Sequence, residues 1–211
     1  MPIRLGYACI NMHLSDTQKL TSSRTMRKAT FLSKGLPAVS DLIVSNLDSL
    51  QKIMQWNADN GFEVFRMSST MFPWASEYRF DQLPDYKKIR KQMSSIGQFA
   101  IENGIRLSFH PGQFVCLGSK TTKVVDNAMQ DLEIHGLVMD WMHQPRNHNA
   151  KINIHIGGAY NDKPGTAKRF LQNADRLSAS VYDRLTVEND DRPNLYTTQE
   201  LYDMIYMEAG I

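Results

Sequence analysis

The sequence predicts an α/β fold in which five strands alternate with five helices. Short apolar runs recur between segments with helical periodicity, and glycines follow several of those segments. Strands that alternate with helices of ten or more residues form a parallel sheet, as either a doubly wound sheet or a (β/α) barrel. No glycine-rich dinucleotide motif follows the first strand, which disfavours a Rossmann fold.

The apolar runs are expected to be strands, and the amphipathic segments are expected to be helices. The expected strands cover residues 3–9, 62–68, 105–109, 152–156 and 184–187. The expected helices cover residues 46–60, 85–103, 163–177 and 198–208, and a further helix is expected to start after a cap at Thr121 or Thr122 and to end before the polar stretch 144–150. Ser45 is the expected cap of the first helix, and Gly61 and Gly104 are expected to end the first two.

Composition and charge exclude some classes of protein and leave others open. With 42% hydrophobic and 22% charged residues, the chain can bury a core and is not disordered. Its net charge is only +2, but residues 17–40 hold five basic and no acidic side chains. This segment is expected to be either a loop that contacts phosphate or a solvated surface loop.

The sequence favours a cytoplasmic protein. Its two cysteines, Cys9 and Cys116, provide neither a disulfide framework nor zinc-knuckle spacing. The N-terminal residues lack the pattern of a secretion signal, and no run of about 18 apolar residues is present to span a bilayer. We therefore expect no membrane partner.

Three predicted strands end in side chains of the metal-ligand type. His110, His155 and Glu188 follow the third, fourth and fifth strands. The carboxyl ends of parallel strands lie at one edge of a sheet, so these side chains are expected to converge. Two imidazoles and a carboxylate suit Zn²⁺, Mn²⁺ or Fe²⁺. A lone histidine at a strand end more often has a structural role. The prediction of a metal site therefore depends on the two histidines and the glutamate occurring at equivalent positions.

Five segments carry a resemblance to a known family. They are RLGYACIN at 4–11, FRMSS at 65–69, SFHPGQF at 108–114, HIGGAYNDK at 155–163 and TVENDD at 186–191. In this order and spacing they resemble the ultraviolet damage endonuclease family. The resemblance implies a (β/α)₈ barrel with a divalent metal cluster, with Mn²⁺ favoured over Zn²⁺ or Mg²⁺. It also implies a DNA repair enzyme that nicks damaged double-stranded DNA on the 5′ side of pyrimidine photodimers.

The resemblance assigns catalytic and metal-binding roles to His110, His155 and Glu188, with Glu188 bridging two metals. Gln113 and Phe114 would probe the duplex, although the family commonly has tyrosine where this chain has Phe114.

The resemblance also assigns DNA and lesion contacts to three further residues. Tyr7 and Asn11 match positions that border the pocket for the flipped lesion. Lys163 is placed either to contact phosphate or to form a surface ion pair.

The length of the chain limits the number of βα units that it can form. An eight-unit barrel typically needs about 250 residues, and the 211-residue chain stops where a sixth strand is expected. We therefore expect residues 1–211 to form a single, incomplete barrel domain with about five of eight βα units. Three explanations stay open: a fragment, a naturally truncated protein, or one piece of a split enzyme in which a second chain supplies the missing part. Without that part, we expect the chain to self-associate and to nick DNA poorly.

Two other functions remain open from the sequence. A metal-dependent sugar isomerase or epimerase would also place His and Glu side chains at strand ends, but it needs neither a wedge loop nor phosphate contacts. A non-catalytic damaged-DNA-binding remnant would fit the incomplete barrel.

Overall fold

The computed structural model describes residues 3–192 and 194–211, which fold as two compact units. The first unit comprises Met1–Phe109 with Val138–Pro145, and the second comprises His110–Leu137 with Arg146–Ile211. Strands and helices alternate within each unit, and all five predicted strands are present. None of the helices that the structure describes is long and apolar enough to cross a membrane.

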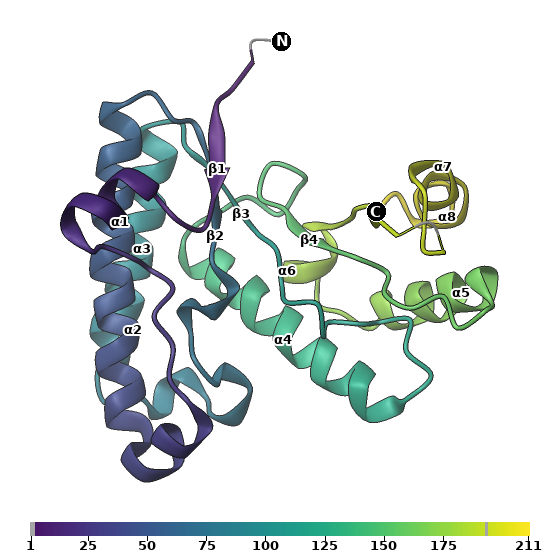
Figure 1. Ribbon diagram of the computed structural model, residues 1–211, viewed down its shortest axis with the longest axis horizontal. Coiled ribbons are helices and arrows are strands. Elements are labelled where there is room, and N and C mark those ends of the chain that lie inside the picture. The colour runs from purple at the N-terminus through teal and green to yellow at the C-terminus, as the bar shows by residue number, and fades with distance from the viewer. Residues whose placement is uncertain (1–2, 193) are drawn as a thin grey trace. The chain divides into compact units, whose positions relative to one another are not determined.

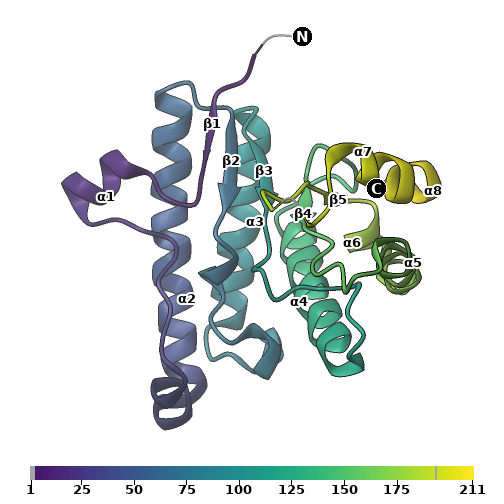
Figure 2. The ribbon, with the colours of Figure 1, turned by 45° about the vertical axis from the view of Figure 1, so that its right-hand side comes forward.

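Three parallel strands form the sheet of the first unit. They are β1 (Gly6–Ala8), β2 (Val64–Met67) and β3 (Arg106–Phe109), and each pairs with the next along the chain. The long helices α2 (Lys28–Asp59) and α3 (Tyr86–Glu102) connect them and lie side by side in Figures 1 and 2. Each crossover of this unit therefore passes through a helix, as expected for parallel strands.

The predicted start of the first long helix is wrong. Ser45 does not cap a helix at residue 46, because α2 begins at Lys28 and its buried apolar stripe includes Val39 and Ile43. Gly35 and Pro37 are residues that usually end helices, so the sequence did not indicate that the helix extends back to Lys28. Gly35 has non-helical dihedrals (φ 64°, ψ −159°) that kink α2. Pro37 comes directly after the kink, where a helix turn restarts and proline is tolerated.

The basic segment at residues 17–40 is a loop over residues 19–27, which contain Lys19, Arg24 and Arg27, and is helical from Lys28 onward, so the expectation of a loop holds for only part of it. A short helix, α1 (Met12–Gln18), precedes it, and the N-terminal turns of α2 contain Lys28 and Lys34. The Arg24 guanidinium donates to the Ser49 hydroxyl at 2.8 Å. Part of the basic charge therefore supports the packing of this unit. The later segment 69–84 forms three short 3₁₀ turns, Ser69–Met71, Ala75–Glu77 and Phe80–Gln82.

Two parallel strands form the sheet of the second unit, β4 (Ile152–Ile154) and β5 (Leu185–Val187). The helix α4 (Thr122–Trp141), of which residues up to Leu137 belong to this unit, precedes β4. The elements that follow β4 are α5 (Lys163–Ala174), α6 (Ala179–Tyr182), α7 (Thr198–Leu201), a π-helical turn (Tyr202–Tyr206) and α8 (Met207–Ala209). The predicted helix at 198–208 is thus present, with a π-helical turn in its middle.

The register of β4 and β5 separates an apolar face from a polar face. Asn153 lies opposite Thr186, and Ile154 lies opposite Val187. Successive side chains of a strand point to opposite faces. The apolar face packs into the core of this unit, where Ile154 and Phe170 of α5 are almost completely buried. The polar side chains must therefore point to the other face.

Candidate metal centre

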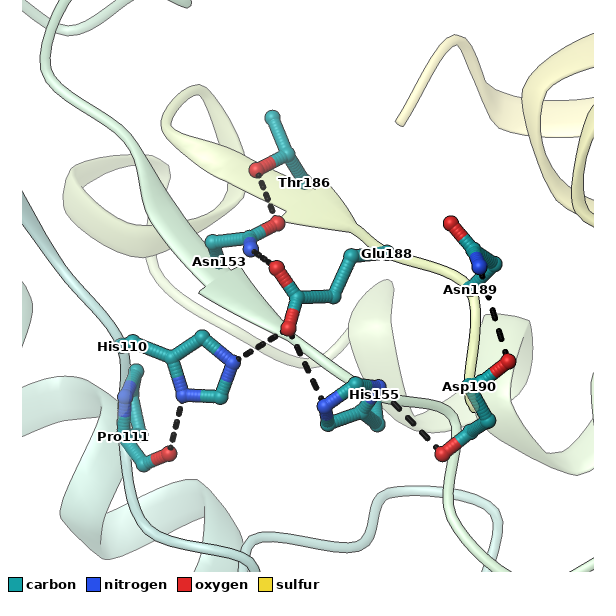
Figure 3. Close-up of polar contacts among 8 residues, drawn as sticks. All are labelled: His110, Pro111, Asn153, His155, Thr186, Glu188, Asn189 and Asp190. Atoms are coloured by element: carbon teal, nitrogen blue, oxygen red, sulfur yellow. Dashed lines mark hydrogen bonds and ion pairs between the residues drawn. The ribbon is translucent and has the colours of Figure 1, made fainter. Parts of the chain in front are cut away.

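His110, His155 and Glu188 converge in the second unit. His110 directly follows β3, whereas His155 and Glu188 each directly follow a strand of the β4–β5 pair. One ligand atom from each side chain lies within 4.8 Å of the other two (Figure 3). The sequence expectation that these three side chains meet at the carboxyl ends of strands agrees with this geometry.

The Glu188 carboxylate is the centre of the cluster. Its Oε1 accepts a hydrogen bond from His110 Nε2 at 2.7 Å and lies 3.0 Å from His155 Nε2. Its Oε2 accepts from the Asn153 side-chain amide, which in turn accepts from the Thr186 hydroxyl at 3.0 Å. Figure 3 shows both oxygens of the carboxylate engaged, one by the imidazoles and the other by the amide. The orientation of Glu188 is thus defined from two sides.

Opposing effects set the pKa of Glu188. Partial burial raises the pKa, but the hydrogen bond from His110, the charges of His110 and His155 and the Asn153 amide together outweigh burial. The net result is a pKa below the ordinary value. Glu188 is therefore ionised at neutral pH, which is the form that coordinates cations.

The second nitrogen of each histidine faces a protein acceptor. His110 Nδ1 lies 3.0 Å from the Pro111 carbonyl oxygen, and His155 Nδ1 lies 3.4 Å from Asp190 Oδ1. When a cation is bound, a proton on Nδ1 would leave Nε2 of each imidazole free to coordinate it. Outer partners of this kind fix the ring orientation of metal-ligating histidines.

The donor chemistry of the cluster fits a divalent transition metal. Two neutral imidazole nitrogens and one ionised carboxylate oxygen are the ligands that Zn²⁺, Mn²⁺ and Fe²⁺ accept. A buried oxygen of Asp190, Oδ2, has no hydrogen-bond partner among the residues that the structure describes. It adds negative charge beside His155, which favours a cation nearby. His110, His155 and Glu188 are accordingly the residues that would hold the metal.

A cavity of about 840 Å³ adjoins the cluster. His110, His155 and Asp190 line it, together with the segment that follows β4. In that segment Tyr160 and Asn161 both adopt left-handed backbone conformations, with φ of 51° and 56°. Such strain in residues other than glycine is concentrated at functional sites. The cavity is large enough for a small ligand or for a part of a larger one.

Gln113 and Phe114 lie at the tip of a tight turn beside this cavity. The Val115 amide donates to the Gly112 carbonyl at 3.0 Å, so Gln113 and Phe114 occupy the two central positions of the turn. The Phe114 side chain is 82% exposed. The ring of Phe114 therefore lies in solvent at the tip of the turn.

Tyr7 and Asn11 lie in the first unit, where both take part in internal hydrogen bonds. The Tyr7 hydroxyl donates to Asn57 Oδ1 at 2.6 Å and accepts from the Asn11 amide at 2.7 Å. Asn11 Oδ1 also caps α1 by accepting from the Leu14 amide at 2.9 Å. These contacts give both residues a structural role, and their role at a lesion pocket stays a prediction.

Lys163 forms an ion pair at the start of α5. Its Nζ lies 2.7 and 2.8 Å from the two carboxylate oxygens of Glu200. Of the two roles expected for this lysine, the ion pair is the one present. A contact with DNA phosphate stays a prediction, because it would require Lys163 to leave Glu200 or to bind both groups.

Three polar residues around the cluster were not predicted from the sequence: Asn153, Thr186 and Asp190. The signal for the first two is the alternation of apolar and polar residues in INIH at 152–155 and LTVE at 185–188. Such alternation places Asn153 on the same face as His155, and Thr186 on the same face as Glu188. Asp190 lies in the loop after β5, where no periodicity operates.

The alternation of strands and helices, with a candidate metal centre at the carboxyl ends of strands, defines an α/β protein of the (β/α)-barrel type. The model of the family described as UV-endonuclease UvdE matches residues 3–208. The chain belongs to this family, as its sequence motifs predict.

Several relatives carry the same description. A UV-damage endonuclease of Schizosaccharomyces pombe is 37% identical over 191 residues, covering 89% of this chain and 32% of that protein. A UV DNA damage endonuclease of Bacillus cereus strain Q1 is 32% identical over 207 residues, covering 95% of this chain and 62% of that protein. This chain therefore spans between about one third and three fifths of the length of these two relatives.

A solved structure supports the fold. The crystal structure of SacUVDE matches the whole chain with a TM-score of 0.87 and 30% sequence identity, and the match covers 68% of that chain. The fold class is therefore the α/β barrel type predicted from the sequence, in an incomplete form.

The Lys163–Glu200 ion pair predicts a pH dependence of stability. The hydrogen bonds from Lys163 and from the Thr197 amide lower the pKa of Glu200 from 4.5 to about 2. A carboxyl group with a lowered pKa in the folded state stabilises the fold above pH 4.5, and this contribution is lost as the pH falls toward 2. Glu200→Gln should therefore reduce stability at pH 7 and have progressively less effect between pH 4.5 and 2, as measured by urea unfolding.

Lys163→Met is the matched control, because it breaks the same ion pair from the other side. The difference in free energy of unfolding between Lys163→Met and the unmodified chain should also become smaller as the pH falls from 4.5 to 2. A Glu200→Gln variant that differs from the unmodified chain by the same amount at pH 7 and at pH 2 would contradict this account.

Proposed function

We propose that this chain forms part of a DNA repair endonuclease that nicks duplex DNA on the 5′ side of ultraviolet photoproducts by metal-assisted hydrolysis of a phosphodiester. The observation that carries the proposal is the convergence of His110, His155 and Glu188 within 4.8 Å of one another in a chain of the UvdE family. The family supports a repair endonuclease, and the donor set supports assistance by a metal.

The side chains of the cluster have distinct roles in this proposal. Glu188 supplies the negative charge that holds a cation, and the two Nε2 atoms supply neutral donors. The Pro111 carbonyl at His110 Nδ1 and the Asp190 carboxylate 3.4 Å from His155 Nδ1 are the acceptors that would favour the matching tautomer of each histidine. A bound divalent cation, with Mn²⁺ favoured, would supply Lewis-acid polarisation of the phosphate oxygens.

The reaction can be tested on a duplex that carries one photodimer, with Mn²⁺ present. Because the family members are longer, the chain is assayed alone and together with the region that lies C-terminal to the matched segment in a longer relative. We expect slow nicking by the chain alone and faster nicking by the mixture. Glu188→Gln should lower the rate by ~100-fold or more in both conditions, since it removes the charged ligand. Glu208→Gln, an exposed carboxyl group on α8, is the matched control and should leave the rate unchanged.

Two results would contradict the endonuclease. If the unmodified chain binds the irradiated duplex but leaves it intact under both conditions, the non-catalytic damaged-DNA-binding alternative is favoured. If Glu188→Gln nicks as fast as the unmodified chain, the cluster is not the site of the chemistry.

The turn at Gly112–Val115 supports selection of damaged duplexes. A photodimer weakens base stacking, so the damaged nucleotides leave the helix at a lower free-energy cost than normal ones. Gln113 and the exposed ring of Phe114 are placed at the tip of the turn, where they can fill the gap in the stack. This role requires stacking and shape, but not charge.

Replacing the turn residues should therefore affect discrimination more than total affinity. Gln113→Ala combined with Phe114→Ala should lower the preference for irradiated over intact duplex by ~10-fold, which corresponds to the loss of about one stacking contact. Fluorescence anisotropy with matched irradiated and intact duplexes measures both affinities. Equal losses for the two duplexes would show that the turn contributes general contacts only.

A further inference from the structure

We infer that Thr186 and Asn153 form a positioning relay that orients the Glu188 carboxylate for metal binding. This inference rests on the proposed metal centre and assigns residues outside its ligand set. Neither Thr186 nor Asn153 belongs to the ligand group. Asn153 acts on the site through its hydrogen bond to Glu188, and Thr186 acts through its hydrogen bond to Asn153 (Figure 3).

The parallel register of β4 and β5 creates the relay. Asn153 lies directly opposite Thr186, and the Thr186 hydroxyl lies 3.0 Å from Asn153 Oδ1. Glu188 is two residues beyond Thr186 and therefore projects from the same face. Its Oε2 accepts from the Asn153 side-chain nitrogen. A continuous row of three polar side chains thus runs along one face toward the ligand cluster.

The direction of the hydrogen bonds follows from the chemistry of the groups. An ionised carboxylate can only accept, so Asn153 must turn its NH₂ group toward Glu188. This orientation turns Asn153 Oδ1 toward Thr186, whose hydroxyl must then donate. A methyl group in place of this hydroxyl would leave Oδ1 without its donor. The amide would then be free to rotate and to present its oxygen to the carboxylate.

The relay divides the two oxygens of Glu188 between separate functions. Oε2 is held by the amide, while Oε1 faces His110 and His155 at 2.7 and 3.0 Å. A glutamate side chain has several rotatable bonds, and fixing it before the cation arrives lowers the entropy lost on binding. Outer hydrogen-bond partners of metal ligands typically change metal affinity by about 10–100-fold.

The test uses Mn²⁺ as the probe and the 211-residue chain as the protein. Thr186→Val keeps the shape of the side chain and removes the donor. We expect it to raise the dissociation constant for Mn²⁺ by about 10-fold or more, as measured by calorimetry or by electron paramagnetic resonance. Thr186→Ser restores the hydroxyl and should recover most of the affinity. Asn153→Leu removes the direct donor to Glu188 and should weaken binding at least as much as Thr186→Val.

A matched control separates positioning from stability. Thr197→Val removes a threonine hydroxyl that caps α7 in the same unit, where it accepts from the Glu200 amide at 3.3 Å. This variant should lower the thermal midpoint without changing the affinity for Mn²⁺. Thr186→Val and Thr197→Val are therefore expected to differ in metal affinity even where their thermal midpoints are similar.

The outcomes distinguish the relay from the metal centre. If the unmodified chain binds Mn²⁺ and Thr186→Val binds it within twofold of the same affinity, the relay is overturned and the metal centre stands. If Thr186→Ser binds as weakly as Thr186→Val, the hydroxyl is not the operative group and the relay is again overturned. If the unmodified chain does not bind Mn²⁺, the proposed metal centre fails and the relay fails with it.

Discussion

The parallel pairing of β4 with β5 is the constraint on which the candidate site depends. Its register places Asn153 opposite Thr186, and the amide of Glu188 donates to the Ile154 carbonyl at 3.1 Å directly beyond the pair. A shift of one residue in either strand would turn its polar side chains into the apolar core. The burial of Ile154 and its neighbours therefore holds the register, and the register assembles the polar face.

The electrostatics of the cluster follow from this arrangement. A partly buried carboxylate costs free energy unless charges or hydrogen bonds compensate for its lost hydration. At Glu188 that compensation comes from two imidazoles on one oxygen and an amide on the other. The same arrangement gathers two imidazole nitrogens and one anionic oxygen at a single point, which is the donor set of a divalent metal. The interactions that keep Glu188 ionised thus also prepare the site for a cation.

The strands and the three clustered side chains could be predicted from the sequence because their signals are local. Apolar runs end directly before His110, His155 and Glu188, and parallel strands bring their carboxyl ends together. The start of α2 was not predicted, because Gly35 and Pro37 are typical of helix ends. In the structure the helix kinks at Gly35, and its apolar stripe continues past the kink. The ion pair of Lys163 with Glu200 and the contact of Asp190 with His155 join residues in different elements. Spacing along the chain does not predict such contacts.

The most direct test of the central claim is anomalous diffraction at the manganese edge from crystals of the chain soaked in Mn²⁺. We expect a peak about 2.2 Å from His110 Nε2, from His155 Nε2 and from a carboxylate oxygen of Glu188. The peak should be absent from crystals of Glu188→Gln. A map in which manganese binds elsewhere, or leaves these three side chains without a peak while other sites are occupied, would contradict the account.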